Sequence, residues 1–411
     1  MRMACGYSHH LLYYYSGESV SLDLSFRVES ALEAQTLAIS NVAKKMRAEG
    51  KDIASLSVGE PDFDTPLCAK IAAIQAVNEN FTHYTDSNGI AELREEIAKK
   101  FRDENGIVSA TSSNVIVSGG AKQCIFNTLM ALCNEGDEVV ILAPYWVSYP
   151  AMAILCGAKP VIVEGTFDNA FKVMPEQLRQ AITPKTKCVI INSPSNPTGM
   201  MYSETEIRAF ADIIAKHDCY LLSDEIYEKL TYGDIRHFSP GAISAISSKV
   251  ITVNGMSKAY AMTGWRIGYL HAPDRIFKEI SKVQGQSTSH PSSIAQKASL
   301  AALKEGSDDV KKMQEAFAIR KSLTCELLSH IPGIHFHVPD GAFYVFINFE
   351  DIKDDVSLCS YLLKHHHVAL VPGDAFGCAG ALRISFAASE ETLRKGIQRL
   401  AEGLSAFGSQ A

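Results

Sequence analysis

Residues 187–227 read KCVIINSPSNPTGMMYSETEIRAFADIIAKHDCYLLSDEIY and contain a strand, a helix and a second strand in succession. The apolar runs at 187–191 and 219–223 have the length and composition of buried strands. The segment between them has helical periodicity and opens with Ser203, followed three residues later by Glu206, which is a capping box. Two buried strands joined by a helix predict parallel pairing in a sheet covered on both faces.

The alternation of strands and helices continues on both sides of this unit. Further strands are predicted over 114–118, 138–143 and 249–253, and helices over 67–79, 91–104, 121–133 and 203–216. After about residue 300 the order changes to a long helix over about 306–330, strands near 343–348 and 381–386, and helices near 356–366 and 389–405. We therefore expect an α/β fold, with a mainly parallel sheet in residues 66–300 and a smaller α+β domain in residues 301–411.

The composition is that of an ordinary folded protein. The 411 residues are 46% hydrophobic and 21% charged, which excludes a disordered chain, a collagen and a long coiled coil. The net charge of −7, without a Lys/Arg-rich run, gives no electrostatic basis for binding nucleic acid or an anionic membrane. Ten scattered cysteines without a CxxC pair exclude a zinc ribbon and a thioredoxin-like motif. They favour thiols in a reducing compartment, so we expect a cytoplasmic location.

Three other stretches invite a membrane, targeting or metal interpretation. Residues 139–158 carry no charge, but Pro144 and Pro150 argue against a spanning helix, and a strand, a loop and a short helix are expected instead. Residues 1–24 are expected to form an N-terminal extension; their first twenty lack the sustained apolar run of a signal peptide. No metal site is predicted at His365–His367, because adjacent side chains point in different directions on any regular element.

Polar side chains follow three of the predicted strands at the point where each strand ends. Asp224 comes directly after one strand, residues 192–199 read NSPSNPTG after another, and residues 254–258 read NGMSK after a third. Because ligands of open α/β sheets bind at the carboxyl ends of the strands, we expect these side chains to form one polar cluster. Neither a GxGxxG nor a GxxxxGK[ST] motif occurs, so a dinucleotide site and a P-loop have no support.

Five short strings, in this order along the chain, resemble the class I aminotransferases that depend on pyridoxal phosphate. They are GEPDF at 59–63, PYWVSYP at 144–150, SPSNPTG at 193–199, SDEIY at 223–227, and SK at 257–258 followed by Arg266. The resemblance runs from about Ser25 to residue 405 and is closest to the bacterial I-beta group of aspartate aminotransferases, which also contains prephenate aminotransferases. It implies fold type I, with a seven-stranded sheet in the large domain and a small domain that joins residues 25–65 to residues 301–411.

The resemblance implies a site for pyridoxal 5′-phosphate. Lys258 is expected to form the Schiff base with the cofactor aldehyde and, once substrate displaces it, to move a proton at the substrate Cα. Asp224 is expected to pair with the pyridine nitrogen, because a protonated ring is an electron sink. Tyr227 and Asn196 are expected to hydrogen-bond the phenolic oxygen of the cofactor.

The same resemblance assigns the rest of the cofactor pocket. Arg266 is expected to bind the phosphate together with the amides of a helix that begins near Gly120 and Ala121. Trp146 is expected to stack on the cofactor ring. Tyr84 aligns with a tyrosine that reaches the phosphate of the neighbouring subunit, which implies a homodimer with shared active sites.

Substrate contacts are implied as well. Arg383 lies on an apolar strand and is expected to clamp the substrate α-carboxylate, because the guanidinium fork matches a carboxylate bidentately. Gly59 belongs to a loop that touches the same carboxylate, where glycine allows a close backbone approach. Trp146 and Asn196 are also expected beside the substrate.

The residues that select the substrate differ from those of animal-type enzymes, which use an arginine of the other subunit for the side-chain carboxylate. Residues 284–291 hold no arginine, and the I-beta group uses a lysine at the position of Lys122, which favours a dicarboxylic substrate. Thr36 matches a threonine of the prephenate aminotransferases, whereas Leu32 stands where some members carry a basic residue, so prephenate activity stays open. Tyr149 replaces a histidine of the animal-type enzymes, so hydrogen bonding near the ring nitrogen is expected to differ.

The predicted reaction is transamination of L-aspartate with 2-oxoglutarate to oxaloacetate and L-glutamate. Prephenate transamination, alone or in addition, is the first alternative. A lyase on the same scaffold is a more distant one, because one fold supports many chemistries. A regulator that senses an amino acid is a third; the complete catalytic set and the absence of a basic patch argue against it. The expected partners are amino acids and 2-oxo acids, and neither nucleic acid nor membrane.

Overall fold

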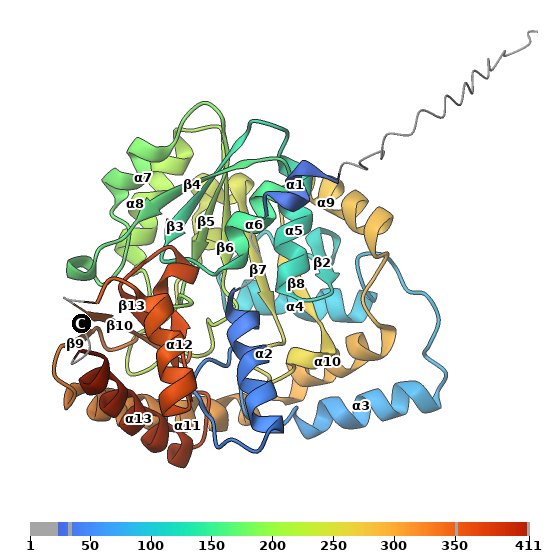
Figure 1. Ribbon diagram of the computed structural model, residues 1–411. Coiled ribbons are helices and arrows are strands. Elements are labelled where there is room, and N and C mark those ends of the chain that lie inside the picture. The colour runs from blue at the N-terminus through green and yellow to red at the C-terminus, as the bar shows by residue number, and fades with distance from the viewer. Residues whose placement is uncertain (1–23, 32–34, 350–351, 409–411) are drawn as a thin grey trace, which may run out of the picture.

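The computed structural model describes residues 24–31, 35–349 and 352–408, and a seven-stranded sheet lies at its centre (Figure 1). The strand order is β2-β8-β7-β6-β5-β3-β4. The strands are β2 (Val115–Ser118), β3 (Glu138–Ala143), β4 (Lys159–Glu164), β5 (Thr186–Asn192), β6 (Tyr220–Asp224), β7 (Val250–Gly255) and β8 (Gly268–His271). Neighbouring strands are parallel except for β8, which is antiparallel to both β2 and β7. The predicted mainly parallel sheet of seven strands is confirmed.

Two of these strands were not located by sequence patterns. β8 has only four residues and begins with a glycine, so it gives little apolar signal. β4 contains Pro160, which argues against a central strand. The structure explains this proline, because β4 is the last strand of the sheet and an edge position tolerates a missing N–H.

Helices cover both faces of the sheet, as the continuous apolar strands predict. They are α3 (Leu67–Asn78), α4 (Ala91–Asp103), α5 (Ala121–Leu132), α6 (Ser148–Leu155), α7 (Pro175–Ala181), α8 (Glu204–Ala215), α9 (Asp274–Ser287) and α10 (Ser293–Glu305). Leu221 of β6 packs with Ile207 and Phe210 of α8, whereas the next residue, Leu222, packs with Ile125 of α5 on the other face. Adjacent residues of one buried strand therefore serve two separate cores.

Two local predictions are also confirmed. Ser203 is the N-cap of α8, and its hydroxyl accepts from the Glu206 N–H while the Glu206 carboxylate accepts from the Ser203 N–H at 2.8 Å. The uncharged stretch at 139–158 contains most of β3, a loop and α6. Among the described residues, no helix combines the length and apolar character that crossing a membrane requires.

The C-terminal part forms a separate antiparallel sheet with strand order β12-β13-β10-β9. Its strands are β9 (Ile334–Phe336), β10 (Tyr344–Phe349), β12 (Val371–Pro372) and β13 (Ala381–Ser385), and its helices are α11 (Ser307–Ser329), α12 (Asp355–His366) and α13 (Glu390–Gly408). The N-terminal segment joins it, because β1 (Ala54–Ser55) pairs in parallel with β11 (Val368–Ala369). That segment also holds α1 (Phe26–Glu29) and α2 (Gln35–Ala48). The domain boundaries at residues 65 and 300 stay predictions.

Candidate active site

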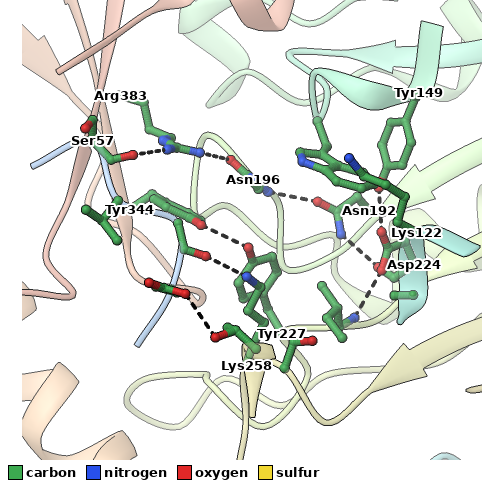
Figure 2. A pocket seen from close by; sticks show the side chains of 18 of the residues that line it. Ser57, Lys122, Tyr149, Asn192, Asn196, Asp224, Tyr227, Lys258, Tyr344 and Arg383 are labelled. Atoms are coloured by element: carbon green, nitrogen blue, oxygen red, sulfur yellow. Dashed lines mark hydrogen bonds between the residues drawn. The ribbon is translucent and has the colours of Figure 1, made fainter. Parts of the chain in front are cut away.

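A cavity of about 450 Å³ lies where β5, β6 and β7 end (Figure 2). Asn192 ends β5, Asp224 ends β6, and Lys258 follows β7 by three residues, so the parallel strands bring three distant segments to one edge. The cavity is also lined by residues 57–60, by Tyr344 of β10 and by Arg383 of β13, which belong to the N-terminal segment and the C-terminal sheet. The cavity is lined by Lys44, Ser57, Val58, Gly59, Glu60, Ala121, Lys122, Trp146, Tyr149, Asn192, Asn196, Asp224, Ile226, Tyr227, Ser257, Lys258, Thr263, Arg266, Tyr344 and Arg383.

Asp224 is a buried carboxylate held from two sides. Its Oδ2 accepts from the Tyr149 hydroxyl at 2.7 Å, and its Oδ1 accepts from the Ile226 N–H at 3.3 Å. Burial raises the pKa of Asp224 to about 6, although these hydrogen bonds oppose the shift. Tyr149, at which the sequence predicted different hydrogen bonding near the ring nitrogen, thus donates directly to this carboxylate. A buried carboxylate of this kind is suited to pairing with a cationic nitrogen.

Lys258 lies at the wall of the cavity, and its Nζ donates to the Gly59 carbonyl at 2.5 Å. Desolvation lowers the pKa of Lys258 to about 8; Glu60 opposes the shift and Arg383 adds to it. A lysine with a lowered pKa has a substantial neutral fraction near neutral pH, and the neutral amine is the form that attacks a carbonyl.

Tyr227 and Tyr344 meet across the cavity, and their hydroxyls are 3.0 Å apart. Both side chains are buried, and burial raises the pKa of Tyr227 well above its ordinary value. Tyr344 begins β10, and sequence reasoning did not identify it as a site residue. Its neighbours in sequence are all apolar, so it reads as a core position until the fold places its hydroxyl beside Tyr227.

Arg383 is a buried cation on β13 without a carboxylate partner in the described structure. Its two terminal nitrogens donate to Asn196 Oδ1 and to the Ser57 carbonyl, both at 2.8 Å (Figure 2), and its Nε has no hydrogen-bond partner. The guanidinium lies 4.3 Å from the centre of the Tyr344 ring, a cation–π contact. Since neutral oxygens leave its charge uncompensated, Arg383 is suited to binding an anion that enters the cavity.

The other end of the cavity is built around the N-terminus of α5. Gly120 is the N-cap with φ +97°, and a Cβ at this position would lie 2.6 Å from a terminal nitrogen of Arg266. Arg266 is itself in the left-handed conformation and donates to the carbonyls of Thr263 and Gly119 at 3.0 and 3.3 Å. The helix amides and the guanidinium therefore point at one place, which is the arrangement of an anion site.

Lys122 and Trp146 lie between these two ends. The Lys122 Nζ is 5.0 Å from the centre of the Trp146 ring, and desolvation in the cavity together with the charge of Arg266 lowers the pKa of Lys122. Its ammonium has no acidic partner among the residues that the structure describes. The cavity thus holds a cation beside the Trp146 ring, in addition to Lys258, Arg266 and Arg383.

Tyr84, a predicted site residue, does not line this cavity. Tyr84 is 93% exposed, and its ring contacts only the edge of His290 among the described rings. Thr36 lies at the start of α2, and its side chain is outside what the structure describes, as is Leu32. Lys44 on α2 lines the cavity mouth, which no sequence motif indicated. Only the fold identifies Lys44 as a lining residue, because α2 is more than a hundred residues away in the sequence from most of the other lining segments.

Comparisons with known proteins identify the family. The family model for aminotransferase class I and II matches residues 51–400, so the chain belongs to that family and is an aminotransferase. Aspartate aminotransferase of Geobacillus stearothermophilus is 44% identical over 386 residues, covering 92% of this chain and 98% of that protein. Aspartate/prephenate aminotransferase of Nitrosomonas europaea is 42% identical over 398 residues, covering 93% and 100%.

Solved structures of aspartate aminotransferases have the same fold as this chain. Aspartate aminotransferase from Thermus thermophilus with maleate superposes with a TM-score of 0.89 at 42% identity, covering 93% of this chain and all of that chain. Aspartate aminotransferase from Rhizobium meliloti has a TM-score of 0.89 at 40% identity, covering 94% and 99%. Fold type I, expected from the resemblance, is confirmed.

Proposed function

We propose that the protein is a pyridoxal phosphate-dependent aspartate aminotransferase that converts L-aspartate and 2-oxoglutarate to oxaloacetate and L-glutamate. The observation that carries the proposal is the pair of uncompensated cations, Arg383 and Lys122, in one cavity with Lys258. A dicarboxylic amino acid presents two anionic groups to two such cations, whereas alanine presents one. The printed names of the relatives support aspartate as substrate, and maleate, named with the Thermus thermophilus structure, is a dicarboxylate.

The residues present fit the cofactor. Gly120 leaves room at the α5 N-terminus for a phosphate, which Arg266 and the helix amides would hold. Asp224 would pair with the ring nitrogen, Trp146 would stack on the ring, and Tyr227 with Asn196 would bind the phenolic oxygen. When bound, pyridoxal phosphate supplies an aldehyde for amines and a ring that accepts electrons.

The protein's own residues have distinct tasks in the proposed reaction. Arg383 gives up its hydrogen bonds to Asn196 and Ser57 and donates to the substrate α-carboxylate instead. Two hydrogen bonds to neutral oxygens are thereby replaced by a bidentate ion pair. Lys258 leaves the Gly59 carbonyl and, as a neutral amine, takes the proton from the substrate Cα. It would pass this proton to the aldehyde carbon of the cofactor, and in the second half-reaction it would move a proton from there to the Cα of the new amino acid. Movement of the C-terminal sheet, which carries Arg383, would exclude water from the cavity.

We propose a homodimer in which Tyr84 contacts the phosphate of the partner's site. Tyr84 is almost fully exposed and lies outside the cavity of its own chain, as a residue that serves a second copy would. The nearby helix α3 presents Leu67, Ile71 and Ile74 at helical spacing, each more than half exposed. An exposed apolar stripe of this kind is typical of an interface.

We also propose a cytoplasmic location for the protein. The nine cysteines in the described part are free thiols, five of them buried, which supports the cytoplasm as a proposed location.

Prephenate is a second candidate substrate. The Nitrosomonas europaea relative carries this activity in its name, and Lys122 would serve the second carboxylate of either substrate. Because the side chain of Thr36 is outside the described structure, only the reaction itself discriminates between the two.

The proposal is tested by half-reactions on purified protein loaded with pyridoxal phosphate. Aspartate, glutamate, arogenate, alanine and phenylalanine are each added alone, and the visible absorption of the bound cofactor is followed. Fast bleaching by aspartate and glutamate with slow bleaching by alanine is expected, and comparable bleaching by arogenate adds prephenate activity. A protein that acquires no visible band contradicts the assignment of Lys258, and release of ammonia or pyruvate without a 2-oxo acid supports the lyase.

A further inference from the structure

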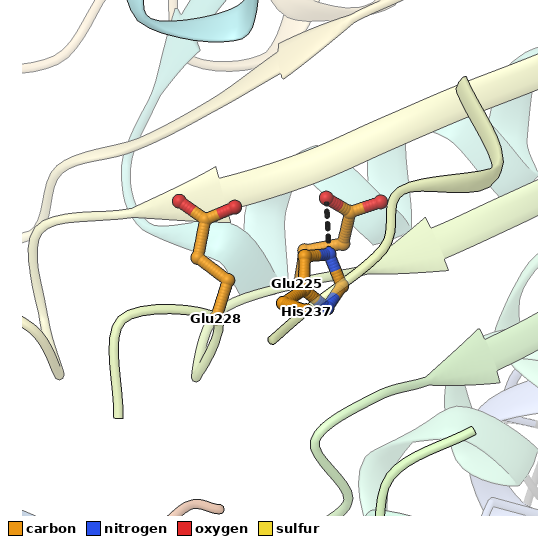
Figure 3. A group of neighbouring side chains, drawn as sticks. All are labelled: Glu225, Glu228 and His237. Atoms are coloured by element: carbon orange, nitrogen blue, oxygen red, sulfur yellow. Dashed lines mark ion pairs between the residues drawn. The ribbon is translucent and has the colours of Figure 1, made fainter. Parts of the chain in front are cut away.

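Glu225, Glu228 and His237 form a cluster of polar side chains outside the cavity lining (Figure 3). The cluster takes no part in the proposed reaction. Residues 224–228 contribute side chains both to the cavity and to this cluster. Asp224 and Tyr227 line the cavity, whereas Glu225 and Glu228 turn away from it into the cluster. The two pairs share one short segment of backbone, so whatever holds the glutamates also sets the direction of Asp224 and Tyr227.

Glu225 is completely buried and accepts from several groups at once. The hydroxyls of Ser223 and Ser239 donate to its Oε1 at 2.9 and 2.7 Å, and Asn105 Nδ2 donates to its Oε2 at 2.9 Å. The His237 Nε2 lies 2.9 Å from the same Oε2. A carboxylate with this many partners has little freedom to move, because each departure would leave a buried polar group unsatisfied.

Glu228 is fastened to α4 and the residues that follow it. Asn105 Nδ2 donates to its Oε2 at 2.6 Å, and the Lys100 ammonium forms a short ion pair with its Oε1. Lys100 also donates to Asn105 Oδ1 at 2.7 Å. The Glu228 N–H donates to the Glu225 carbonyl at 3.0 Å, which closes a turn around Tyr227.

Both carboxylates of the cluster have cationic or titratable partners from this chain. The Lys100 ammonium compensates one carboxylate. Burial lowers the pKa of His237, but Glu225 and Glu228 outweigh this effect and raise the pKa of His237 above its ordinary value. The His237 ring faces the other carboxylate, with its Nε2 2.9 Å from Oε2 of Glu225, so groups of this chain surround both carboxylates.

We propose that Glu225, Glu228 and their partners form a clamp that positions Asp224 and Tyr227 toward the cofactor. The proposal rests on the proposed function, because it assigns the clamp a purpose only if a cofactor occupies the cavity. The Glu225 N–H is anchored to the Val253 carbonyl of β7 at 2.9 Å, so the clamp also fixes this segment relative to the strand that leads to Lys258. These are positioning residues, since none of them lines the cavity.

Glu225→Gln tests the clamp, because it keeps the side-chain volume and removes the charge that Ser223, Ser239, Asn105 and His237 surround. Since small displacements of a positioned group are costly, we expect about tenfold weaker retention of pyridoxal phosphate and a kcat lowered about tenfold with a smaller change in KM. The pH midpoint of the cofactor's visible absorption is expected to shift by on the order of half a unit, because Asp224 and Tyr227 set the charge around the ring. A purely structural network would leave this midpoint unchanged.

The matched control is Glu206→Gln, which removes the charge of another partly buried ion pair, with Lys172 at 2.7 Å, while keeping the capping interaction of α8. It should lower thermal stability without moving the absorption midpoint. Where Glu225→Gln fails to fold, Ser239→Ala removes one of the hydrogen bonds to Glu225, together with the cap that Ser239 gives the Gly241 N–H, and should move the midpoint in the same direction by less. An unchanged midpoint and unchanged cofactor retention in the folded variant overturn the clamp. Wild-type protein that binds no cofactor overturns the proposed function instead.

Discussion

The Tyr149 hydroxyl donates a hydrogen bond of 2.7 Å to Oδ2 of Asp224, and both groups are buried. Tyr149 is the second residue of α6, whereas Asp224 is the last residue of β6. The contact therefore joins two residues that lie 75 positions apart in the sequence. This hydrogen bond favours the ionised form of Asp224, against the burial that raises its pKa.

Tyr149→Phe should therefore weaken the pairing of Asp224 with the ring nitrogen of the cofactor. Loss of one hydrogen bond to a charged acceptor corresponds to about 1.5–3 kcal/mol, so we expect retention of pyridoxal phosphate to fall by at least about tenfold. Equilibrium dialysis of the variant against wild type measures the loss. Equal retention would mean that Tyr149 serves packing only.

Asp224→Asn should stabilise the protein in the absence of cofactor. Its pKa of about 6 in the folded state exceeds 3.8, so its favourable contribution is complete below pH 4 and is lost as the pH rises through 6. A difference of about two pH units corresponds to a cost of up to about 3 kcal/mol above pH 7.

Thermal unfolding of the cofactor-free variant and wild type checks this sign. The gain in Tm should be larger at pH 8 than at pH 5, because the wild-type carboxyl is largely protonated at the lower pH. With cofactor bound, the ranking should reverse. A variant that is less stable than wild type at both pH values contradicts the prediction.

Lys258→Ala should abolish transamination while leaving the fold intact. In the described structure the Lys258 side chain makes one hydrogen bond, to the Gly59 carbonyl, and Lys258→Ala keeps the backbone bonds, so the fold should persist. We expect turnover to fall by at least about 10³-fold, since both the covalent attachment and the proton transfer are lost. Turnover assays beside circular dichroism separate the two effects, and retained turnover would refute the mechanism.

Arg383→Lys should show that the guanidinium fork matters, and not only its charge. A lysine cannot bind the α-carboxylate bidentately or keep the contacts to both Asn196 and Ser57. We expect kcat/KM for aspartate to fall by about 10²-fold, mostly through KM. Steady-state kinetics decide this, and Arg275→Lys on the outer helix α9 is a suitable control.

Lys122→Ala should reduce the preference for aspartate over alanine. Because only aspartate presents a second carboxylate, we expect the ratio of the two kcat/KM values to fall by at least about tenfold. Lys44→Ala, at the exposed mouth of the cavity, should change the ratio by only about twofold, since an exposed charge is screened by water. A larger effect of Lys44 than of Lys122 would move the side-chain anchor to α2.

Local sequence patterns determined strands β2, β3, β5, β6 and β7 of the large sheet, the capped helix α8 and the identity of the strand-end residues Asp224 and Lys258. These features depend on contacts within a few residues, such as the hydrogen bonds between Ser203 and Glu206, and on the apolar runs that only a covered sheet can bury. The short strand β8 and the edge strand β4 were not predicted, because the pattern of apolar residues in each is too weak to indicate a strand.

The tertiary structure alone decided which distant residues complete the site. Arg383 meets the carbonyl of Ser57 across 326 positions of chain, and Tyr344 meets Tyr227 across 117. The same holds for the clamp, where Lys100 and Asn105 reach Glu228 only because α4 packs behind the end of β6. Burial is the physical reason. Once the sheet excludes water, each polar group requires a partner, and folding determines which group is near enough to serve.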